Sequence, residues 1–361
     1  MKHRKTIPVT LLTGFLGSGK TTLINTLLAD PRMRDAAIVV NEYGSVAVDH
    51  DLIHEGREGF ALTTSTGCLC CTASSDIRAS LYELHDRYAR GELPAFNHVV
   101  VETTGLADPA PIINSLIAGG TPAMGLRDHV VARSFLLAGV IATFDVDSGD
   151  ATLAAHAECR KQLAFADHIV LTKTDLADAA PWPARLRRIN PTASLHDCQA
   201  ANFDATALFN QGTPYVTADR PENVLEWLAM ERATTAHDHH QHDHDHDHDH
   251  DHHAHRHDDG IEAWPLFCDT PLERAAVDRF LETITDQPGA ALLRLKGIFA
   301  LSDDPARPLV VHAVQHRLYP PVRLDAWPSV DRRSRVVLIG RDLPRAPIEA
   351  LLAKVDRPTH V

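Results

Sequence analysis

The sequence predicts an α/β fold in which a mostly parallel, helix-covered sheet precedes a smaller α+β domain. Two observations indicate this architecture. In the first 232 residues, short apolar runs alternate with segments long enough for helical crossovers, which is typical of a parallel sheet. A tract of histidine and aspartate then interrupts the pattern before apolar runs resume. The chain has 361 residues, 44% of them hydrophobic, which is enough for two domains with substantial cores.

The elements of the first domain, residues 1–232, follow from these apolar runs. The amphipathic segment Thr22 to Leu28 is expected to form the helix after the first strand. The expected strands are Ile7 to Leu12, Ala36 to Val40, His98 to Val101, Val140 to Phe144 and Ile169 to Leu171.

The second domain is expected at residues 261–361, after a disordered linker at residues 233–260 that has almost nothing to bury. Helices are expected from Leu272 to Thr285 and near Ile348 to Val355. The expected strands are Ile261 to Phe267, Leu292 to Leu301, Leu309 to Leu318 and Arg335 to Ile339.

Charge and composition exclude several classes of protein. The formal net charge is −13, of which residues 237–259, with eight Asp and one Arg, contribute −7 and the rest −6. This balance disfavours nucleic acid or an anionic membrane as a partner. The basic Met1 to Lys5 precedes a strand-like run, and we find no apolar run of membrane-spanning length. With three of six cysteines packed into four positions, we expect a reducing, cytoplasmic location rather than a disulfide framework.

The strongest motif is Gly14-Phe15-Leu16-Gly17-Ser18-Gly19-Lys20-Thr21, a full match to G-x-x-x-x-G-K-[ST] between a strand and a helix. Glycines let backbone N–H groups wrap phosphates, Lys20 neutralises their charge, and Thr21 places a hydroxyl on Mg²⁺. The motif predicts a P-loop nucleotide hydrolase. The expected nucleotide-binding residues here are Gly14, Gly17, Ser18, Gly19, Lys20, Thr21 and Thr22.

A second motif is the apolar run that ends in Glu102-Thr103-Thr104-Gly105. Its carboxylate can hold Mg²⁺ or orient the attacking water, and Gly105 allows a backbone N–H to approach the γ-phosphate. We therefore predict Lys20, Glu102 and Gly105 as catalytic residues, with Glu102 also at Mg²⁺. No arginine finger in the same chain is identifiable, so turnover is expected to be slow.

The base is predicted from Thr172-Lys173-Thr174-Asp175, which follows an apolar run. A carboxylate at Asp175 can accept both the ring N–H and the exocyclic amine of guanine, which adenine cannot satisfy. Lys173 can pack its stem along the base. Thr172 departs from the Asn that usually begins such loops. GTP is the predicted nucleotide.

A thiol cluster, Cys68-Leu69-Cys70-Cys71, lies between these motifs. Two or three thiolates can bind one borderline ion such as Zn²⁺, and Glu42 can complete the coordination or touch Mg²⁺. Taken alone, the cluster also allows a structural zinc, a redox site or a buried turn. The isolated Cys159, Cys198 and Cys268 are interpreted as core residues.

Together the motifs resemble CobW-type GTPases, relatives of the nickel-inserting urease and hydrogenase maturation GTPases. The resemblance covers nearly the whole chain and implies a metallochaperone that holds zinc, or cobalt in some members, at the cysteine motif and delivers it to a client protein in a GTP-dependent cycle. Within that family the guanine loop often begins with Thr. Besides the segments quoted above, the family resemblance rests on Asn41-Glu42-Tyr43-Gly44, Leu106-Ala107-Asp108-Pro109, Arg294-Leu295-Lys296-Gly297, Val314-Gln315-His316-Arg317-Leu318 and Ile339-Gly340-Arg341-Asp342-Leu343.

Half of the chain's 24 histidines lie in one tract that nearly alternates with Asp. Imidazoles at this density bind Zn²⁺, Ni²⁺, Co²⁺ or Cu²⁺, and the cost of ordering the chain predicts weak, multi-site binding. A merely solvated linker is the alternative. The predicted ligands are His237, His239, His240, His242, His244, His246, His248, His250, His252, His253, His255 and His257.

The predicted function is therefore a GTPase metallochaperone that uses GTP, Mg²⁺ and Zn²⁺ or Co²⁺ and serves a client metalloenzyme. A homodimer or the client is a candidate source of a catalytic cation. One alternative is a metal buffer or sensor in which the histidine tract binds the metal and nucleotide has a structural or regulatory role. Another is a small-molecule P-loop kinase, for which we find no acceptor base.

Overall fold

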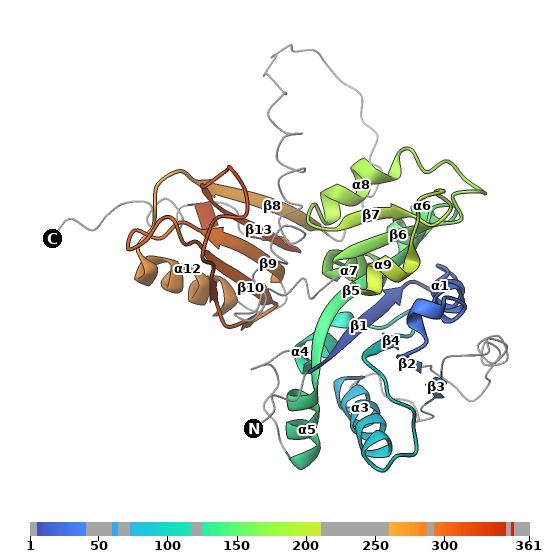
Figure 1. Ribbon diagram of the computed structural model, residues 1–361. Helices are drawn as coiled ribbons and strands as arrows, with labels where there is room; N and C mark the ends of the chain where they lie inside the picture. Colours follow the sequence, from blue (N-terminus) through green and yellow to red (C-terminus); the bar gives the residue numbers. More distant parts are fainter. Residues whose placement is uncertain are drawn as a thin grey trace, which may run out of the picture.

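The computed structural model describes residues 6–40, 60–63, 73–116, 125–210, 260–286, 292–343 and 348–349. These residues form two sheets, a larger one from the N-terminal part and a smaller one from the C-terminal part (Figure 1). The predicted fold class is confirmed. Its domain boundaries stay a prediction, because residues 211–259, which contain the expected linker, lie outside the described residues.

The larger sheet has seven described strands in the order β3-β2-β4-β1-β5-β6-β7, and every neighbouring pair is parallel. With β1 at its centre, the sheet grows to one side through β4 and to the other through β5. The carboxyl ends of such strands meet at one edge, where ligands bind in open parallel sheets. The strands are β1 (Ile7–Gly14), β2 (Ala36–Val40), β3 (Phe60–Thr63), β4 (His98–Glu102), β5 (Phe135–Asp145), β6 (His168–Thr172) and β7 (Ser194–Asp197).

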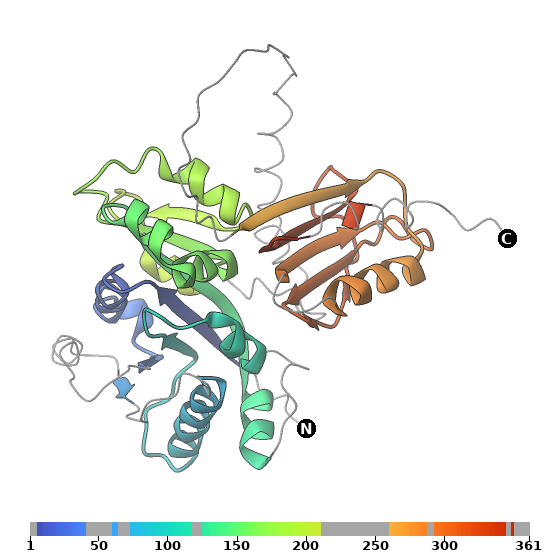
Figure 2. The same cartoon turned by 180° about the vertical axis from the view of Figure 1, so that it is seen from behind.

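Helices cover both faces of this sheet (Figures 1 and 2). Val99 and Val101 pack into one apolar cluster with α3, α4 and α7, whereas Val100 between them packs into a second cluster with α1 and α9. Burial on both faces explains why the strands are continuous apolar runs. The helices are α1 (Lys20–Leu28), η1 (Pro31–Met33), α3 (Ala73–Ala89), α4 (Pro109–Leu116), α5 (Leu126–Ser134), α6 (Gly149–Ala155), α7 (Ala157–Phe165), α8 (Trp182–Ile189) and α9 (Ala205–Asn210).

The smaller sheet is antiparallel, with the order β11-β10-β9-β13-β8 and β12 paired to β10. On β13, Val336 and Leu338 pack toward α12, whereas Val337 and Ile339 belong to the cluster of the larger domain. One face of this sheet thus carries its own helix and the other packs against the larger domain. Its elements are β8 (Ile261–Cys268), α12 (Arg274–Asp286), β9 (Leu292–Phe299), β10 (Leu309–Val314), β11 (Arg317–Leu318), β12 (Val322–Arg323) and β13 (Ser334–Arg341).

The prediction of one strand from Leu309 to Leu318 is wrong. The chain reverses at Gln315 and His316, so that Val314 pairs with Arg317 across an antiparallel hairpin. Gln315 has a φ of 53°, in the left-handed region that Gln rarely adopts. The sequence pattern from Leu309 to Leu318 therefore contains a turn that its residue types do not indicate.

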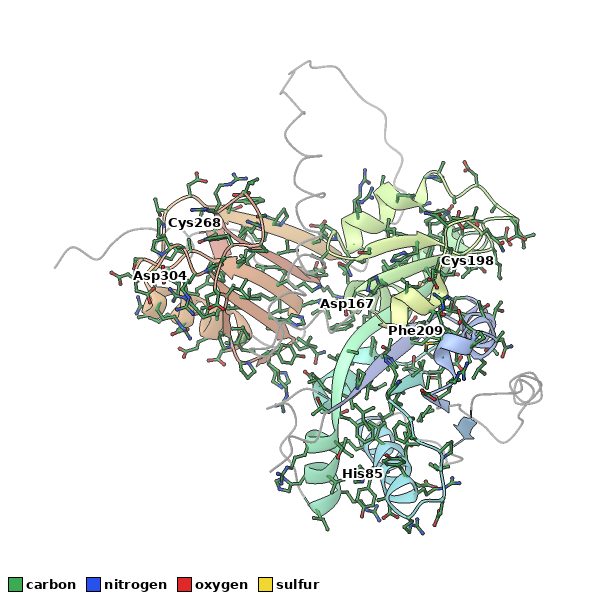
Figure 3. All side chains as sticks on the ribbon, in the orientation of Figure 1. His85, Asp167, Cys198, Phe209, Cys268 and Asp304 are labelled. Carbon is green, nitrogen blue, oxygen red and sulfur yellow. The ribbon has the colours of Figure 1, made fainter. Side chains whose placement is uncertain are left out.

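A buried ion cluster joins the two domains at Asp167, which lies between the two sheets in Figure 3. Arg294 of β9 forms an ion pair with Asp167, and its guanidinium also donates to the carbonyls of Phe165, at 2.6 Å, and Ala166, at 3.0 Å. The Lys296 amino group lies 3.1 Å from the same carboxylate. All three charged side chains are at most 3% exposed.

The cluster is compensated electrostatically. Burial by itself raises the pKa of Asp167, but the nearby charges of Arg294 and Lys296 outweigh it and hold the pKa below its usual value. Burial, together with the charge of Arg294, lowers the pKa of Lys296 to about 8. Asp167 therefore stays ionised at neutral pH.

None of the helices in the described ranges has the length and apolar character needed to cross a membrane.

Candidate functional site

The predicted nucleotide motifs meet at the carboxyl edge of the larger sheet. Gly14 ends β1 and pairs with Thr143 of β5, while Leu12 lies in register with Glu102, the last residue of β4. Thr172, the last residue of β6, pairs with Asp145 at the end of β5. Three motifs far apart in sequence thus share one edge.

The phosphate-binding loop has the backbone that the motif requires. Gly17 and Gly19 have φ values of 71° and 91°, in the region that side chains disfavour, and Gly19 caps the first turn of α1. The Lys20 ammonium donates to the carbonyl of Gly14, at 2.9 Å, and of Phe15, at 3.1 Å. The buried Lys20 charge therefore lies across the mouth of the loop.

The side chains of this loop differ in exposure. Thr21 is half-buried and Thr22 exposed, both in the first turn of α1, while the Ser18 hydroxyl lies 2.6 Å from that of Thr143. The N-terminus of a helix favours anions, and Thr21 has its hydroxyl there, while the buried Glu102 ends the strand that pairs with β1. A hydroxyl and a carboxylate are ligands that suit Mg²⁺, so these residues fit such an ion.

The loop between β4 and α4, residues 103–108, packs against the end of β1 and the phosphate-binding loop. The Thr103 N–H donates to the Leu12 carbonyl at 2.9 Å, and its hydroxyl donates to that of Thr13 at 3.0 Å. A Cβ on Gly105 would lie 2.6 Å from the backbone nitrogen of Leu16, closer than atoms pack. Only glycine permits this approach.

The predicted guanine loop is tied to the same structure. The Thr172 hydroxyl donates to the Ser18 carbonyl at 2.9 Å and to the Phe144 carbonyl at 3.2 Å. Lys173 has a φ of 57°, and its ammonium lies 2.6 Å from the Asp145 carboxylate. Asp175 is exposed, with the Gln199 amide 3.4 Å away. Its carboxylate therefore has access to a ligand.

Asp145 was not predicted from the sequence. Burial raises its pKa, but hydrogen bonds from Lys173 and Ser148 outweigh burial and leave the pKa below its usual value. The ionised carboxylate thus holds Lys173 in place. Its position, the last residue of an apolar strand beside the phosphate-binding loop, is the signal that could have identified it.

The predicted ligands of the transferred ion and those of the histidine tract lie outside the described residues. They are Cys68, Cys70, Cys71, Glu42 and the twelve histidines of the tract. Within the described part of the chain, no group of three or more His, Cys, Asp or Glu side chains is arranged to hold a metal ion.

The isolated cysteines behave as predicted. Cys159 and Cys268 are buried, and the half-buried Cys198 packs beside an apolar cluster. Burial raises the pKa of Cys159 to about 12, which keeps the thiol protonated. Cys198 and Cys268 lie far apart, one in each domain (Figure 3).

Comparison with known proteins accounts for both domains. Residues 8–197 match the family model described as CobW/HypB/UreG, nucleotide-binding domain, and residues 261–356 match the cobalamin synthesis protein cobW C-terminal domain. The zinc chaperone YjiA of Escherichia coli is 32% identical, covering 96% of this chain and 98% of its own. The zinc chaperone CobW of a Sinorhizobium species is 28% identical, covering 96% of both chains.

Among solved structures, the Zn(II)-bound YjiA GTPase from E. coli matches with a TM-score of 0.70 and 25% identity. The match covers 98% of this chain and all of that one. The likeness therefore extends over both sheets and is not confined to the nucleotide motifs.

Proposed function

The chain belongs to the CobW/HypB/UreG family, and on that premise we propose that this GTPase carries Zn(II) at Cys68, Cys70 and Cys71 and transfers it to a client metalloprotein. The resemblance predicted from the motifs is confirmed by the family match. As a GTP-dependent metallochaperone the chain joins relatives named as zinc chaperones, one of them solved as a Zn(II)-bound GTPase.

The register of three strands supports the thiol site most directly. Glu102 lies opposite Val40, the last residue of β2, and Val40 lies opposite Thr63, the last residue of β3. The segment with Glu42 therefore begins where β2 ends, and the segment with Cys68 to Cys71 begins where β3 ends. Both leave the sheet at the edge where the nucleotide motifs meet.

The residues of this edge divide the reaction among them. Backbone N–H groups of residues 14–19 bind the phosphates, Lys20 neutralises their charge, and Asp175 accepts two hydrogen bonds from guanine. Thr21 and Glu102 would hold Mg²⁺, which supplies further charge neutralisation when bound. The Gly105 N–H faces the γ-phosphate. Loss of that phosphate on hydrolysis relaxes the loops and lowers metal affinity.

The coupling is tested by measuring Zn²⁺ affinity with a non-hydrolysable GTP analogue and with GDP. Higher affinity in the analogue complex is expected, and equal affinities would contradict coupling. Cys70→Ser should lower the affinity while GTP binding is kept, because the serine hydroxyl is a poor ligand for Zn²⁺. Unchanged affinity would place the site elsewhere.

Co²⁺ is the second candidate cargo. Thiolate ligands favour zinc over cobalt only weakly, so the same titration with Co²⁺ separates the two ions. The client is sought by presenting the loaded protein, with GTP and Mg²⁺, to apo-metalloenzymes and measuring their activation.

A further inference from the structure

Gln162 on α7 is a buried polar side chain that the proposed reaction does not use. It is 1% exposed, and its amide nitrogen donates to the carbonyls of Gly105, at 3.0 Å, and Ala107, at 3.1 Å. The two acceptors lie 57 and 55 positions away in the sequence, in the loop between β4 and α4. The Gln162 carboxamide thus binds the loop that carries Gly105 at two points.

The two acceptors fix which way round the carboxamide sits. Exchanging its nitrogen and oxygen would bring Gln162 Oε1 against two carbonyl oxygens, which repel it. In the observed orientation Oε1 is buried, and no hydrogen-bond partner for it occurs among the residues described. An apolar side chain of the same volume would avoid the free-energy cost of burying Oε1 without a partner. The two bonds donated by the amide nitrogen are therefore the reason for a glutamine at this position.

Two hydrogen bonds, one of them from Gln162, restrain the peptide planes on either side of Gly105. The Ala107 N–H donates to the Thr104 carbonyl at 3.1 Å, which fixes the plane containing the Gly105 N–H. Gln162 fixes the next plane through the Gly105 carbonyl. Glycine has soft dihedral angles on both sides, so without these two restraints its N–H can turn away.

The helix that carries Gln162 is itself well anchored. At its C-terminal end the Asn190 amide donates to the carbonyls of Leu163, Ala164 and Ala166 at 2.8 to 3.2 Å. Beside Gln162, the Lys161 ammonium lies 3.1 Å from the Asp108 carboxylate, in the same loop. The loop of residues 103–108 is therefore held by an anchored helix and not by another loop.

We propose that Gln162 is a positioning residue for GTP hydrolysis, which holds the loop of residues 103–108 so that the Gly105 N–H faces the γ-phosphate. This rests on the role proposed for Gly105. Since GDP has no γ-phosphate, the contribution of Gln162 appears in the transition state and with GTP, and not with GDP.

The test uses two variants of nearly unchanged volume in the full-length protein. Gln162→Met removes both donated bonds, and Gln162→Glu removes the amide donor and, when ionised, places a carboxylate that repels the same carbonyls. Removing a direct donor to a transition state costs about 10²–10³ in kcat, so loss of a group that positions the donor is expected to cost about tenfold. Gln162→Glu should lose at least as much, with GDP affinity within about threefold of wild type in both.

Leu163→Ala is the matched control for stability. Leu163 is the next residue of α7, is 1% exposed, and packs into an apolar cluster with Phe144 and Trp182 that includes none of residues 103–108. Its truncation should lower the Tm at least as much as either Gln162 change but leave kcat intact. The inference is overturned if both Gln162 variants keep wild-type kcat, or if Leu163→Ala loses kcat in proportion to its Tm.

The result is separable from the proposed metal transfer, because kcat is measured without Zn²⁺ or client. If the wild type hydrolyses GTP but transfers no metal, the chaperone proposal fails and the Gln162 comparison still stands. If transfer occurs and the Gln162 variants hydrolyse GTP normally, only the positioning role fails.

Discussion

Thr172 joins the predicted guanine loop to the phosphate-binding loop. Its hydroxyl donates to the carbonyl of Ser18, which lies in the phosphate-binding loop. Base selection is predicted to depend on Asp175, whose exposed carboxylate lies at the end of the guanine loop.

Asp175→Asn is predicted to exchange guanine for xanthine specificity. The carboxylate accepts from both the ring N–H and the amine of guanine, whereas an amide can accept one bond and donate to the carbonyl that xanthine has in place of the amine. We expect GTP affinity to fall about 100-fold, or about 3 kcal/mol, and XTP affinity to rise.

The measurement is competition of GTP and XTP against a fluorescent GDP analogue. Asp178→Asn, an exposed carboxylate in the following turn, is the control and should change neither affinity. Equal loss of both nucleotides in Asp175→Asn would contradict the base-reading role.

Residue roles could be predicted where a local motif carries them, and not where partners meet through the fold. Lys20 and Glu102 belong to contiguous patterns that indicate their chemistry. Gln162 and Asp145 act through residues 57 and 28 positions away. No local pattern encodes those pairings, because they depend on how α7 and β5 lie beside the loops.

At the scale of elements, the same limit applies to strands. The fully buried strand β4 is a continuous apolar run and could be predicted to within one residue. The sheet-edge strand β7, Ser194–Asp197, is half-buried and polar, so its sequence resembles a loop. The turn at Gln315 could not be predicted because Gln is not a residue type that marks a turn with positive φ.

The pairing of β1 with β4 is predicted to weaken in acid. His98 of β4 is buried, with its Nε2 2.9 Å from the Thr10 hydroxyl, and burial lowers its pKa to about 4. The unfolded chain, with a His pKa of about 6.5, binds the proton more readily, so stability rises with pH in this interval. It is complete above pH 6.5 and is lost as the pH falls toward 4.

His168 shares this behaviour with His98. Burial also lowers the pKa of His168 to about 4, against the opposing charge of Asp167. Each contributes up to about 3 kcal/mol across the window. Urea unfolding at pH 7.5 and pH 5 should therefore differ more for wild type than for His98→Gln, and equal differences would contradict the assignment.

At the scale of the whole molecule, the ion cluster at Asp167 makes the two domains one structure. We predict that Arg294→Met destabilises the protein by about 3–5 kcal/mol, because it removes one of the two cations paired with Asp167 and the donor to two buried carbonyls. Arg274→Met removes an exposed ion pair with Asp278 and should cost at most about 1 kcal/mol. Chemical denaturation of both variants gives the comparison, and similar losses would contradict the role of the cluster.

We predict that the histidine tract and the thiol motif divide metal binding between capacity and affinity. Twelve imidazoles interleaved with Asp are expected to bind many ions weakly, since ordering the chain opposes each one, whereas clustered thiolates are expected to bind one ion tightly. Deleting residues 237–257 is therefore predicted to remove most of the bound Zn²⁺ at high metal concentration. One tight site and the GTPase rate should survive, as measured by competition with a chelator of known affinity.

Replacing the twelve histidines with Gln, while keeping every Asp, separates the imidazoles from the acidic charge. If the imidazoles bind the metal, this variant should match the deletion, because Gln is a poor zinc ligand and the linker keeps its length and charge. If neither variant keeps a tight site, the tract holds the metal, the chain is a buffer or sensor, and GTP has a structural or regulatory role. A tight site that survives in both and is lost in Cys70→Ser assigns the transferred ion to the thiols and leaves the tract as its reservoir.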